Sequence, residues 1–337
     1  MARFGNSTIN PDREEDLWKI AEYVADRSGI KEGRDGVIRI ITEIARKNII
    51  TTEQLSRDLN LPVPVVAKVN QLFERYCIVR RRHAGLMLTL RGEKLLKNAL
   101  QVGPDLICPE CSGSGVVIPG RLKNFIKRMK TYQKNRKKPK QNMDQFFATT
   151  ETVMRRAALM HRFGDLEGKR VLLLGDDDLT SVAIARMNLA DKITVVDIDP
   201  DILYLIEKIA AENGFEIDTV EHDLREPLRI QKHHVFFTDP PYTHDGILLF
   251  LRRGFDIADT GYLCYSHKPI GEHLTILQNI VRMNLAITYL MPGFNTYQSM
   301  GTFGGRSLVM RLVRAEPVDL PSGLYTGDIK CCRKRRS

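Results

Sequence analysis

Aspartates gather at four points in the second half of the chain, each directly after a short apolar segment. The four groups are Gly175-Asp176-Asp177-Asp178, Asp197-Ile198-Asp199, His222-Asp223-Leu224 and Asp239-Pro240-Pro241-Tyr242. Carboxylates accept hydrogen bonds from ribose hydroxyls, adenine amino groups and amines. If the apolar segments are parallel strands, their carboxyl ends lie at one edge of a sheet, where ligands of such sheets bind. The pattern therefore predicts one site for a nucleoside and an amine.

Two of the groups suit an adenosyl ligand. Asp197 follows the first group at roughly the 20-residue spacing typical of a carboxylate that accepts both ribose hydroxyls. Asp223 is placed to accept from an adenine amino group. The residues that we expect to bind this donor are Gly175, Asp176, Asp177, Asp197, Ile198, Asp223, Leu224, Asp239 and Pro240.

The first loop carries three aspartates where nucleotide-binding chains usually carry glycines. In an ordinary methyltransferase this loop holds the carboxylate of S-adenosylmethionine, and free backbone N–H groups suit that anion. Three carboxylates would repel it, by about 4 kcal/mol for a pair of charges about 4 Å apart at an effective dielectric of 20. Decarboxylated S-adenosylmethionine presents only an ammonium there. The loop therefore predicts that decarboxylated S-adenosylmethionine is the co-substrate and that its aminopropyl group is transferred. We expect no permanently bound cofactor and no required metal.

The segment Asp239–Tyr242, "DPPY", is typical of enzymes in which an amine nitrogen attacks a sulfonium carbon. Its prolines stiffen the turn, Asp239 can hold an amine, and Tyr242 offers an aromatic face to a cation. A polyamine acceptor fits this chemistry. We expect it to contact Asp177, Asp178, Tyr242, Thr243, His244 and Asp245.

The acceptor amine must lose a proton, which at pH 7 costs about 4–5 kcal/mol for a pKa near 10.4. Clustered carboxylates raise one another's pKa and so become better proton acceptors. We predict Asp178 as the base and Asp239 as the group that orients the nitrogen.

The elements that must position these residues alternate between strand and helix from residue 170 onward. Such alternation predicts a parallel sheet with helices on both faces, and "LAITYLM" and "RSLVMRLV" suit an antiparallel pair at one edge. The outline resembles an α/β class I methyltransferase-like Rossmann domain. Residues 36–100 resemble a winged helix-turn-helix domain, which serves as a DNA reader or as a pairing or substrate-covering module. We expect domains at 1–101 and 144–315, a CxxC turn and basic linker at 102–143, and a basic tail at 316–337.

Cys108 and Cys111 supply two of the four ligands that structural zinc needs, so they are weak metal candidates. The alternatives are a turn with two reduced thiols, or a site completed across a dimer by Cys331 and Cys332. The basic run Arg121–Lys140 predicts a solvated helix and linker, with a nucleic-acid patch as the alternative.

Two stretches are expected to shape the acceptor pocket or merely to connect elements. One is Asp144–Arg156, with Gln145, Thr149 and Thr152 as polar candidates. The other is Met291–Ser307, a long loop of the kind that often forms a lid.

The winged domain, "CPEC", "GDDD" and "DPPYT" together resemble the branched-chain polyamine synthases of thermophiles. The resemblance covers nearly the whole chain, with the family motifs falling on Gly175–Asp178 and Asp239–Thr243. It implies transfer of two aminopropyl groups in turn to the central secondary amine of spermidine. The products would be N4-bis(aminopropyl)spermidine and methylthioadenosine.

Two other functions remain open. A DNA or RNA amino methyltransferase would grip phosphates with the winged domain and receive a flipped base at "DPPY". A winged-helix regulator would only sense an adenosyl ligand. The net charge of +10 on 337 residues favours nucleic acid, but the catalytic region is acidic, so nucleic acid is not required. No apolar stretch suits a membrane span or signal peptide, which predicts a cytoplasmic protein, and winged domains commonly pair, which predicts a homodimer.

Overall fold

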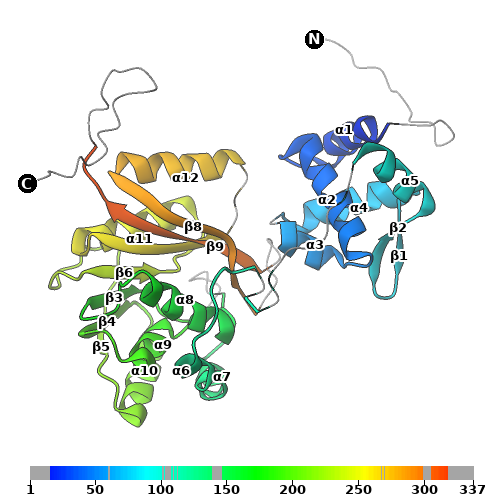
Figure 1. Ribbon diagram of the computed structural model, residues 1–337. Coiled ribbons are helices and arrows are strands. Elements are labelled where there is room, and N and C mark those ends of the chain that lie inside the picture. Colours follow the sequence, from blue (N-terminus) through cyan, green and yellow to red (C-terminus); the bar gives the residue numbers. More distant parts are fainter. Residues whose placement is uncertain are drawn as a thin grey trace, which may run out of the picture.

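The computed structural model describes residues 16–59, 61–100, 102, 108, 110, 111, 113–138, 146–266, 268, 270–298 and 305–317. The first part of the chain folds into helices and one hairpin, drawn in blue and cyan in Figure 1. Its elements are α1 (Leu17–Ser28), α2 (Gly33–Lys47), α3 (Thr52–Leu59), α4 (Val63–Arg75), β1 (Val79–Arg82), β2 (Gly85–Leu88) and α5 (Leu90–Ala99).

Helix α3 begins with a capping box formed by Thr51 and Gln54. The Gln54 backbone N–H donates to the Thr51 hydroxyl over 3.1 Å, and the Thr51 backbone N–H donates to the Gln54 side-chain oxygen over 2.9 Å. This reciprocal capping box satisfies two donors that the helix itself cannot. The apolar faces of α1 to α4 and the hairpin form one core with residues from Leu17 to Leu96. Helix α5 was not predicted; it packs Leu96 into that core.

The remainder of the chain surrounds a seven-stranded sheet of order β5-β4-β3-β6-β7-β9-β8. The strands are β3 (Arg170–Leu174), β4 (Lys192–Asp197), β5 (Asp218–Glu221), β6 (Val235–Thr238), β7 (Thr260–Ser266), β8 (Leu285–Thr296) and β9 (Arg306–Arg314). The pairs from β5 to β7 are parallel, and β9 runs antiparallel to both of its neighbours. The predicted α/β class and antiparallel edge are therefore confirmed.

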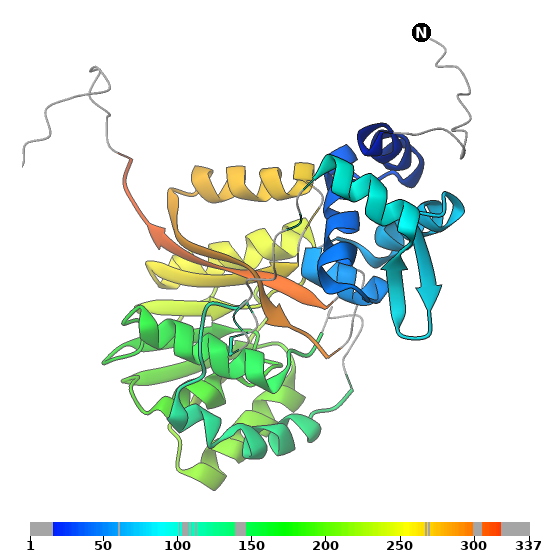
Figure 2. The same cartoon turned by 45° about the vertical axis from the view of Figure 1, so that its right-hand side comes forward.

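Helices cover both faces of this sheet, as Figure 2 shows. They are α6 (Gly120–Lys123), α7 (Ile126–Lys134), α8 (Thr150–Arg162), α9 (Thr180–Met187), α10 (Pro200–Asn213), α11 (His244–Ile257) and α12 (Ile270–Arg282). Side chains of a strand alternate between faces, so β3 sends Val171 and Leu173 toward α8, α9 and α10, and Leu172 and Leu174 toward α11 and α12. Apolar strands of this kind need cover on both sides.

Two expectations about connecting segments hold only in part. The basic run does contain a helix, α7, as predicted. The basic run is not simply a solvated linker, because Leu122, Phe125, Met129 and Tyr132 are buried in the same core as β3. The long loop expected from Met291 is shorter, because Met291–Thr296 belongs to β8. The structure thus ties both segments to the sheet.

Cys108 is exposed and Cys111 is buried, and both are free thiols. In the part of the chain that the structure describes, no group of three His, Cys, Asp or Glu side chains is arranged to hold a metal ion. Cys331, Cys332 and Gln145 lie outside the described residues. None of the described helices is both long and apolar enough to cross a membrane.

Candidate active site

A pocket of about 480 Å³ opens at the carboxyl ends of β3, β4 and β6. Most of the predicted donor contacts line it: Gly175, Asp177, Asp197, Ile198, Asp223, Leu224, Asp239 and Pro240. Tyr242 and Thr243, two of the predicted acceptor contacts, also line it. The four aspartate groups therefore do meet at one edge of the sheet.

The side of the pocket near β4 suits a nucleoside. Each oxygen of the Asp197 carboxylate accepts one backbone N–H, from Asp176 over 3.0 Å and from Asp199 over 2.9 Å. These bonds hold the carboxylate at the end of β4 and leave further lone pairs toward the pocket. Ile198, 44% exposed, adds an apolar surface on which a purine could lie.

Asp223 stands at the rim, in a bidentate pair with Arg225. The Arg225 Nε lies 2.8 Å from one oxygen, and its backbone N–H donates to the other over 2.9 Å. These hydrogen bonds from Arg225 lower the pKa of Asp223. An ionised Asp223 remains able to accept from an adenine amino group, and Arg225 is a pocket residue that the sequence reasoning missed.

The turn after β3 separates the three neighbouring aspartates. Gly175 has φ +71°, which favours glycine, and Leu179 also adopts a left-handed φ of 66° although it carries a side chain. The tight turn directs the carboxylate of Asp176 to the start of α9, where it accepts from Thr180 over 2.6 Å and from Ser181 over 3.0 Å. Asp176 does not line the pocket, so its predicted contact with the donor is wrong; it is a helix cap.

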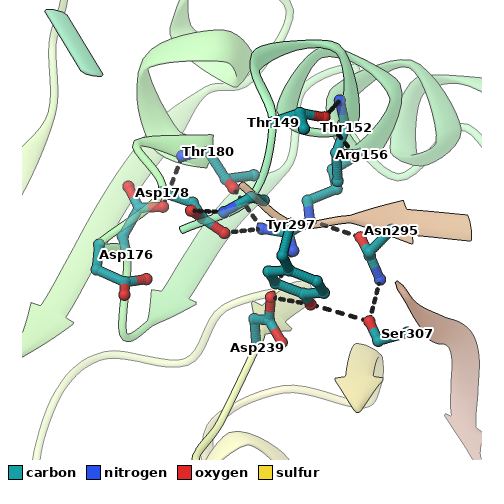
Figure 3. A network of polar contacts seen from close by, with 12 residues as sticks. Thr149, Thr152, Arg156, Asp176, Asp178, Thr180, Asp239, Asn295, Tyr297 and Ser307 are labelled. Atoms are coloured by element: carbon teal, nitrogen blue, oxygen red, sulfur yellow. Dashed lines mark hydrogen bonds and ion pairs between the residues drawn. The ribbon is translucent and has the colours of Figure 1, made fainter. Parts of the chain in front are cut away.

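Asp178 also points away from the pocket, toward Arg136 and toward Arg156, which Figure 3 shows. Its oxygens lie 3.3 Å from Arg136 and 2.7 Å from Arg156, and it accepts from the Ala148 N–H over 2.7 Å. Only 2% of Asp178 is exposed. Asp178 does not line the pocket and its carboxylate oxygens are taken up by Arg136, Arg156 and Ala148, so the predictions that Asp178 is the base and binds the acceptor are wrong.

Asp177 alone of the three turns into the pocket. Within the described ranges no hydrogen bond or ion pair reaches its carboxylate. Burial, then the charges of Asp178, Asp239 and Asp197, raise the pKa of Asp177 well above its usual range. It is therefore the carboxylate of this loop best suited to accept a proton.

Asp239 lies opposite, at the end of β6. It accepts from the hydroxyls of Tyr242 over 2.8 Å and Tyr297 over 2.7 Å, and it pairs with Arg156. Burial raises the pKa of Asp239, against the opposing effect of Arg156 and the tyrosine hydroxyls. Asp239 is thus oriented from three sides toward the pocket.

Two predicted acceptor contacts lie elsewhere. His244 and Asp245 are exposed in the first turn of α11 and do not line the pocket. Thr243 does line it, and its hydroxyl caps α11 by accepting the Gly246 N–H over 3.0 Å. Thr149 and Thr152 bond to each other over 3.0 Å and do not line the pocket either, so Phe146 is the described residue of that stretch that reaches it.

Tyr297 and Arg156 are the main functional residues missed from the sequence. Tyr297 lies in the segment Met291–Ser307, which was expected to be a long loop, and no motif singled it out. Arg156 could have been found, because Val153, Ala157 and Met160 mark the apolar face of its helix and an arginine falls in their midst.

Comparison with known proteins agrees with this geometry. The family model of the branched-chain polyamine synthase A C-terminal domain matches residues 124–319. N(4)-bis(aminopropyl)spermidine synthase of Thermus thermophilus is 32% identical over 86% of this chain and 84% of its own, and that of Thermococcus kodakarensis is 37% identical over 76% and 78%. An uncharacterised protein of Methanocaldococcus jannaschii is 39% identical over 98% of this chain and 87% of its own.

Among solved structures, the branched-chain polyamine synthase of Thermus thermophilus, in complex with N4-aminopropylspermidine and 5'-methylthioadenosine, superposes with a TM-score of 0.70. It is 28% identical, and the match covers 91% of this chain and 95% of that one. The sheet and its site thus define a transferase with a methyltransferase-like Rossmann fold. Within that class, the chain belongs to the branched-chain polyamine synthase family.

Proposed function

We propose that this protein transfers aminopropyl groups from decarboxylated S-adenosylmethionine to the central secondary amine of spermidine. Two successive transfers give N4-bis(aminopropyl)spermidine and two molecules of methylthioadenosine. The observation that carries the proposal is the pair Asp177 and Asp239, which face one pocket at the carboxyl ends of the sheet. Relatives named as N(4)-bis(aminopropyl)spermidine synthases support the same reaction.

Charge at the pocket favours a decarboxylated donor. The carboxylates in and beside the loop outnumber the guanidiniums that reach them. They are Asp176, Asp177, Asp178, Asp197 and Asp239, against Arg136 and Arg156. Each of these carboxylates that is ionised attracts the ammonium of an aminopropyl group and repels the carboxylate of a methyl donor. The sequence argument assumed that all three loop aspartates face the donor. Only Asp177 does so, but the excess of carboxylates over arginines in the whole cluster favours the same decarboxylated donor.

Each transfer begins with loss of the proton that the acceptor amine carries at neutral pH. Asp177 takes that proton, since its raised pKa narrows the gap to the amine. The nitrogen lone pair then forms a bond to the propyl carbon next to sulfur, the carbon–sulfur bond breaks, and its electrons leave on the thioether. After the second transfer the nitrogen is quaternary and has no proton to give, so deprotonation must precede attack in both steps.

Aromatic faces suit the cationic products. Tyr242, Tyr297 and Phe146 line the pocket beside Asp239, and such rings attract amines that have lost their hydrogen-bond donors. Asp239 holds the amine by charge and orients its lone pair. Asp197, Ile198, Asp223 and Leu224 hold the adenosyl part of the donor.

The N-terminal module extends the proposal. The order of α2, α3 and α4 followed by the β1–β2 hairpin supports a winged-helix assignment for the described part of the predicted domain 1–101. The homodimer and the cytoplasmic location stay predictions. Sedimentation velocity of the purified protein checks the first of these.

Mass spectrometry of the products tests the function. Spermidine is offered with decarboxylated S-adenosylmethionine or with S-adenosylmethionine, each omitted in turn. Growth by one and then two aminopropyl units with the decarboxylated donor alone is expected. Methylation of spermidine or of an oligonucleotide by the ordinary donor would overturn the proposal.

A further inference from the structure

Arg156 is a charged residue in the least accessible part of the catalytic region. Only 1% of it is exposed, although it lies on the apolar face of α8 between Val153 and Met160. An unpaired guanidinium at such a depth would be very costly, so its partners must compensate its charge. Burial acts to lower the pKa of Arg156, but Asp239 and Asp178 more than reverse this and raise it.

The guanidinium joins two carboxylates that come from different strands. Its Nη1 lies 2.7 Å from Asp178, in the loop after β3, and its Nη2 pairs with Asp239, after β6. Its Nε donates to the side-chain oxygen of Asn295, on β8, over 2.9 Å. One side chain therefore fixes the relative positions of three strand ends, as Figure 3 shows.

The contacts close into a ring whose protons can be assigned. Tyr297 donates its only hydroxyl proton to Asp239 over 2.7 Å. Ser307, 2.9 Å from the Tyr297 hydroxyl, must then donate to it, and Ser307 accepts from the Asn295 amide over 2.9 Å. Asn295 returns to Arg156 through its oxygen. The ring therefore couples the position of Asp239 to Tyr297, Ser307, Asn295 and Arg156.

This arrangement decides which carboxylate remains available. Asp178 is held by Arg156 and Arg136, and Asp239 by Arg156 and two tyrosines. We propose that Arg156 is a positioning residue: it withdraws Asp178 from the pocket, fixes Asp239 against the acceptor amine, and leaves Asp177 as the proton acceptor. The inference rests on the aminopropyl transfer proposed above.

The sign of the expected pH effect follows from the groups around the pocket. The other charged or titratable side chains that bear on Asp177 and Asp239 are Arg136 just after α7, Asp178, Asp197 from β4, Tyr242, Tyr297 and Cys264 from β7. Arg156 is one of two cations in this set. Its removal leaves the remaining carboxylates to repel one another, so their protons leave only at higher pH.

The test compares Arg156 with Arg311, a largely buried arginine on β9 that pairs with Asp165 and does not line the pocket. We expect R156M to lower kcat at pH 7 by about 100-fold and to move the acidic limb of the kcat/KM profile upward by about one pH unit. R156K keeps the positive charge but loses the guanidinium that contacts both carboxylates at once. The acidic limb of its kcat/KM profile should therefore stay near that of the unmodified protein, while kcat falls by about 10-fold. R311M and R311K should leave the profile of the folded fraction unchanged.

The outcomes separate this inference from the proposed function. Absence of any aminopropyl product from the unmodified protein would overturn the function itself. With an active unmodified protein, a variant R156M whose limb and kcat match those of R311M would overturn the positioning role. Should R156M fail to fold, R156K decides: a kcat equal to that of the unmodified protein overturns the role. Calorimetric binding of methylthioadenosine should be unchanged in R156K, because the adenosyl side of the pocket makes no contact with Arg156 in the described structure.

Discussion

Two buried arginine clusters, one centred on α8 and one on β9, differ in how the guanidinium is shared and in their position relative to the pocket. Arg311 forms a closed pair with Asp165, with contacts of 2.7 and 3.0 Å, completed by the Tyr262 hydroxyl at 2.5 Å. Arg156 divides its guanidinium between Asp178 and Asp239, and Tyr297 completes the second carboxylate. The first cluster lies away from the pocket, whereas Asp239 of the second lines it. We infer that the cluster around Arg311 only stabilises the fold, whereas the cluster of similar composition around Arg156 also orients Asp239 in the pocket.

The two acidic partners should give the largest contrast. D239N keeps the shape of the side chain but removes the charge that holds the amine, so we expect transfer to fall by about 10⁴-fold, equivalent to about 5 kcal/mol. D165N should unfold at lower denaturant concentration yet keep its activity per folded molecule. Product formation normalised by the folded fraction from circular dichroism measures both. A D239N protein with more than a tenth of normal activity would break the comparison.

Asp176 offers a carboxylate of the same loop that reaches no arginine in the described hydrogen bonds and ion pairs. Burial raises its pKa to about 7, from an unfolded value near 3.8. The folded state therefore holds a proton that the unfolded state releases between these values, so stability falls as pH rises from about 4 to 7. D176N cannot ionise and should gain on the unmodified protein by at most about 4 kcal/mol across that window.

Urea unfolding of both proteins at pH 4.5 and pH 7.5 measures this gain. Parallel stability curves for D176N and the unmodified protein would show that the helix cap keeps Asp176 ionised throughout.

Loss of the distal arginine should affect stability alone. R311M leaves Asp165 without its cation in a largely buried position, which we expect to cost about 3 kcal/mol. Its kcat and KM should be unchanged once corrected for the folded fraction. A change in the KM for spermidine would mean that the distal cluster communicates with the pocket.

The two tyrosines give the smallest contrast. Y262F and Y297F each remove one hydroxyl that donates to a carboxylate, a loss of about 1.5 kcal/mol of stability in both. Y297F should also slow transfer by about 10-fold, because Asp239 loses one of its orienting bonds. Thermal melts and initial rates of the two variants side by side check this; equal rates would assign Tyr297 a purely structural role.

The chemistry of the site was more predictable than its geometry. Strand ends and the family motifs follow from apolar runs and local turn residues, so Asp197, Asp223 and Asp239 could be placed at the pocket from the sequence. The direction of each side chain in Asp176–Asp178 could not, because it depends on backbone angles at Gly175 and Leu179 and on partners distant in sequence.

The partners of Asp178 illustrate this limit. Arg136 belongs to a basic run that reads as a solvated surface, and Arg156 to a helix before the first strand of the sheet. Only packing of α7 and α8 against that sheet brings them together. The position of Arg156 among apolar residues of its helix was the one signal in the sequence. It indicates that the arginine is buried, but it does not indicate which carboxylate pairs with it.

The most direct test of the central claim concerns the one loop aspartate that faces the pocket. Single-turnover transfer from decarboxylated S-adenosylmethionine to spermidine is followed in D177N, with binding of methylthioadenosine measured in parallel. No described contact of the Asp177 carboxylate is lost in this variant, so it should fold and bind methylthioadenosine normally. We predict a rate lower by about 10³-fold, and loss of the acidic limb from the remaining activity. A D177N protein that transfers at the normal rate with an unchanged pH profile would contradict the account.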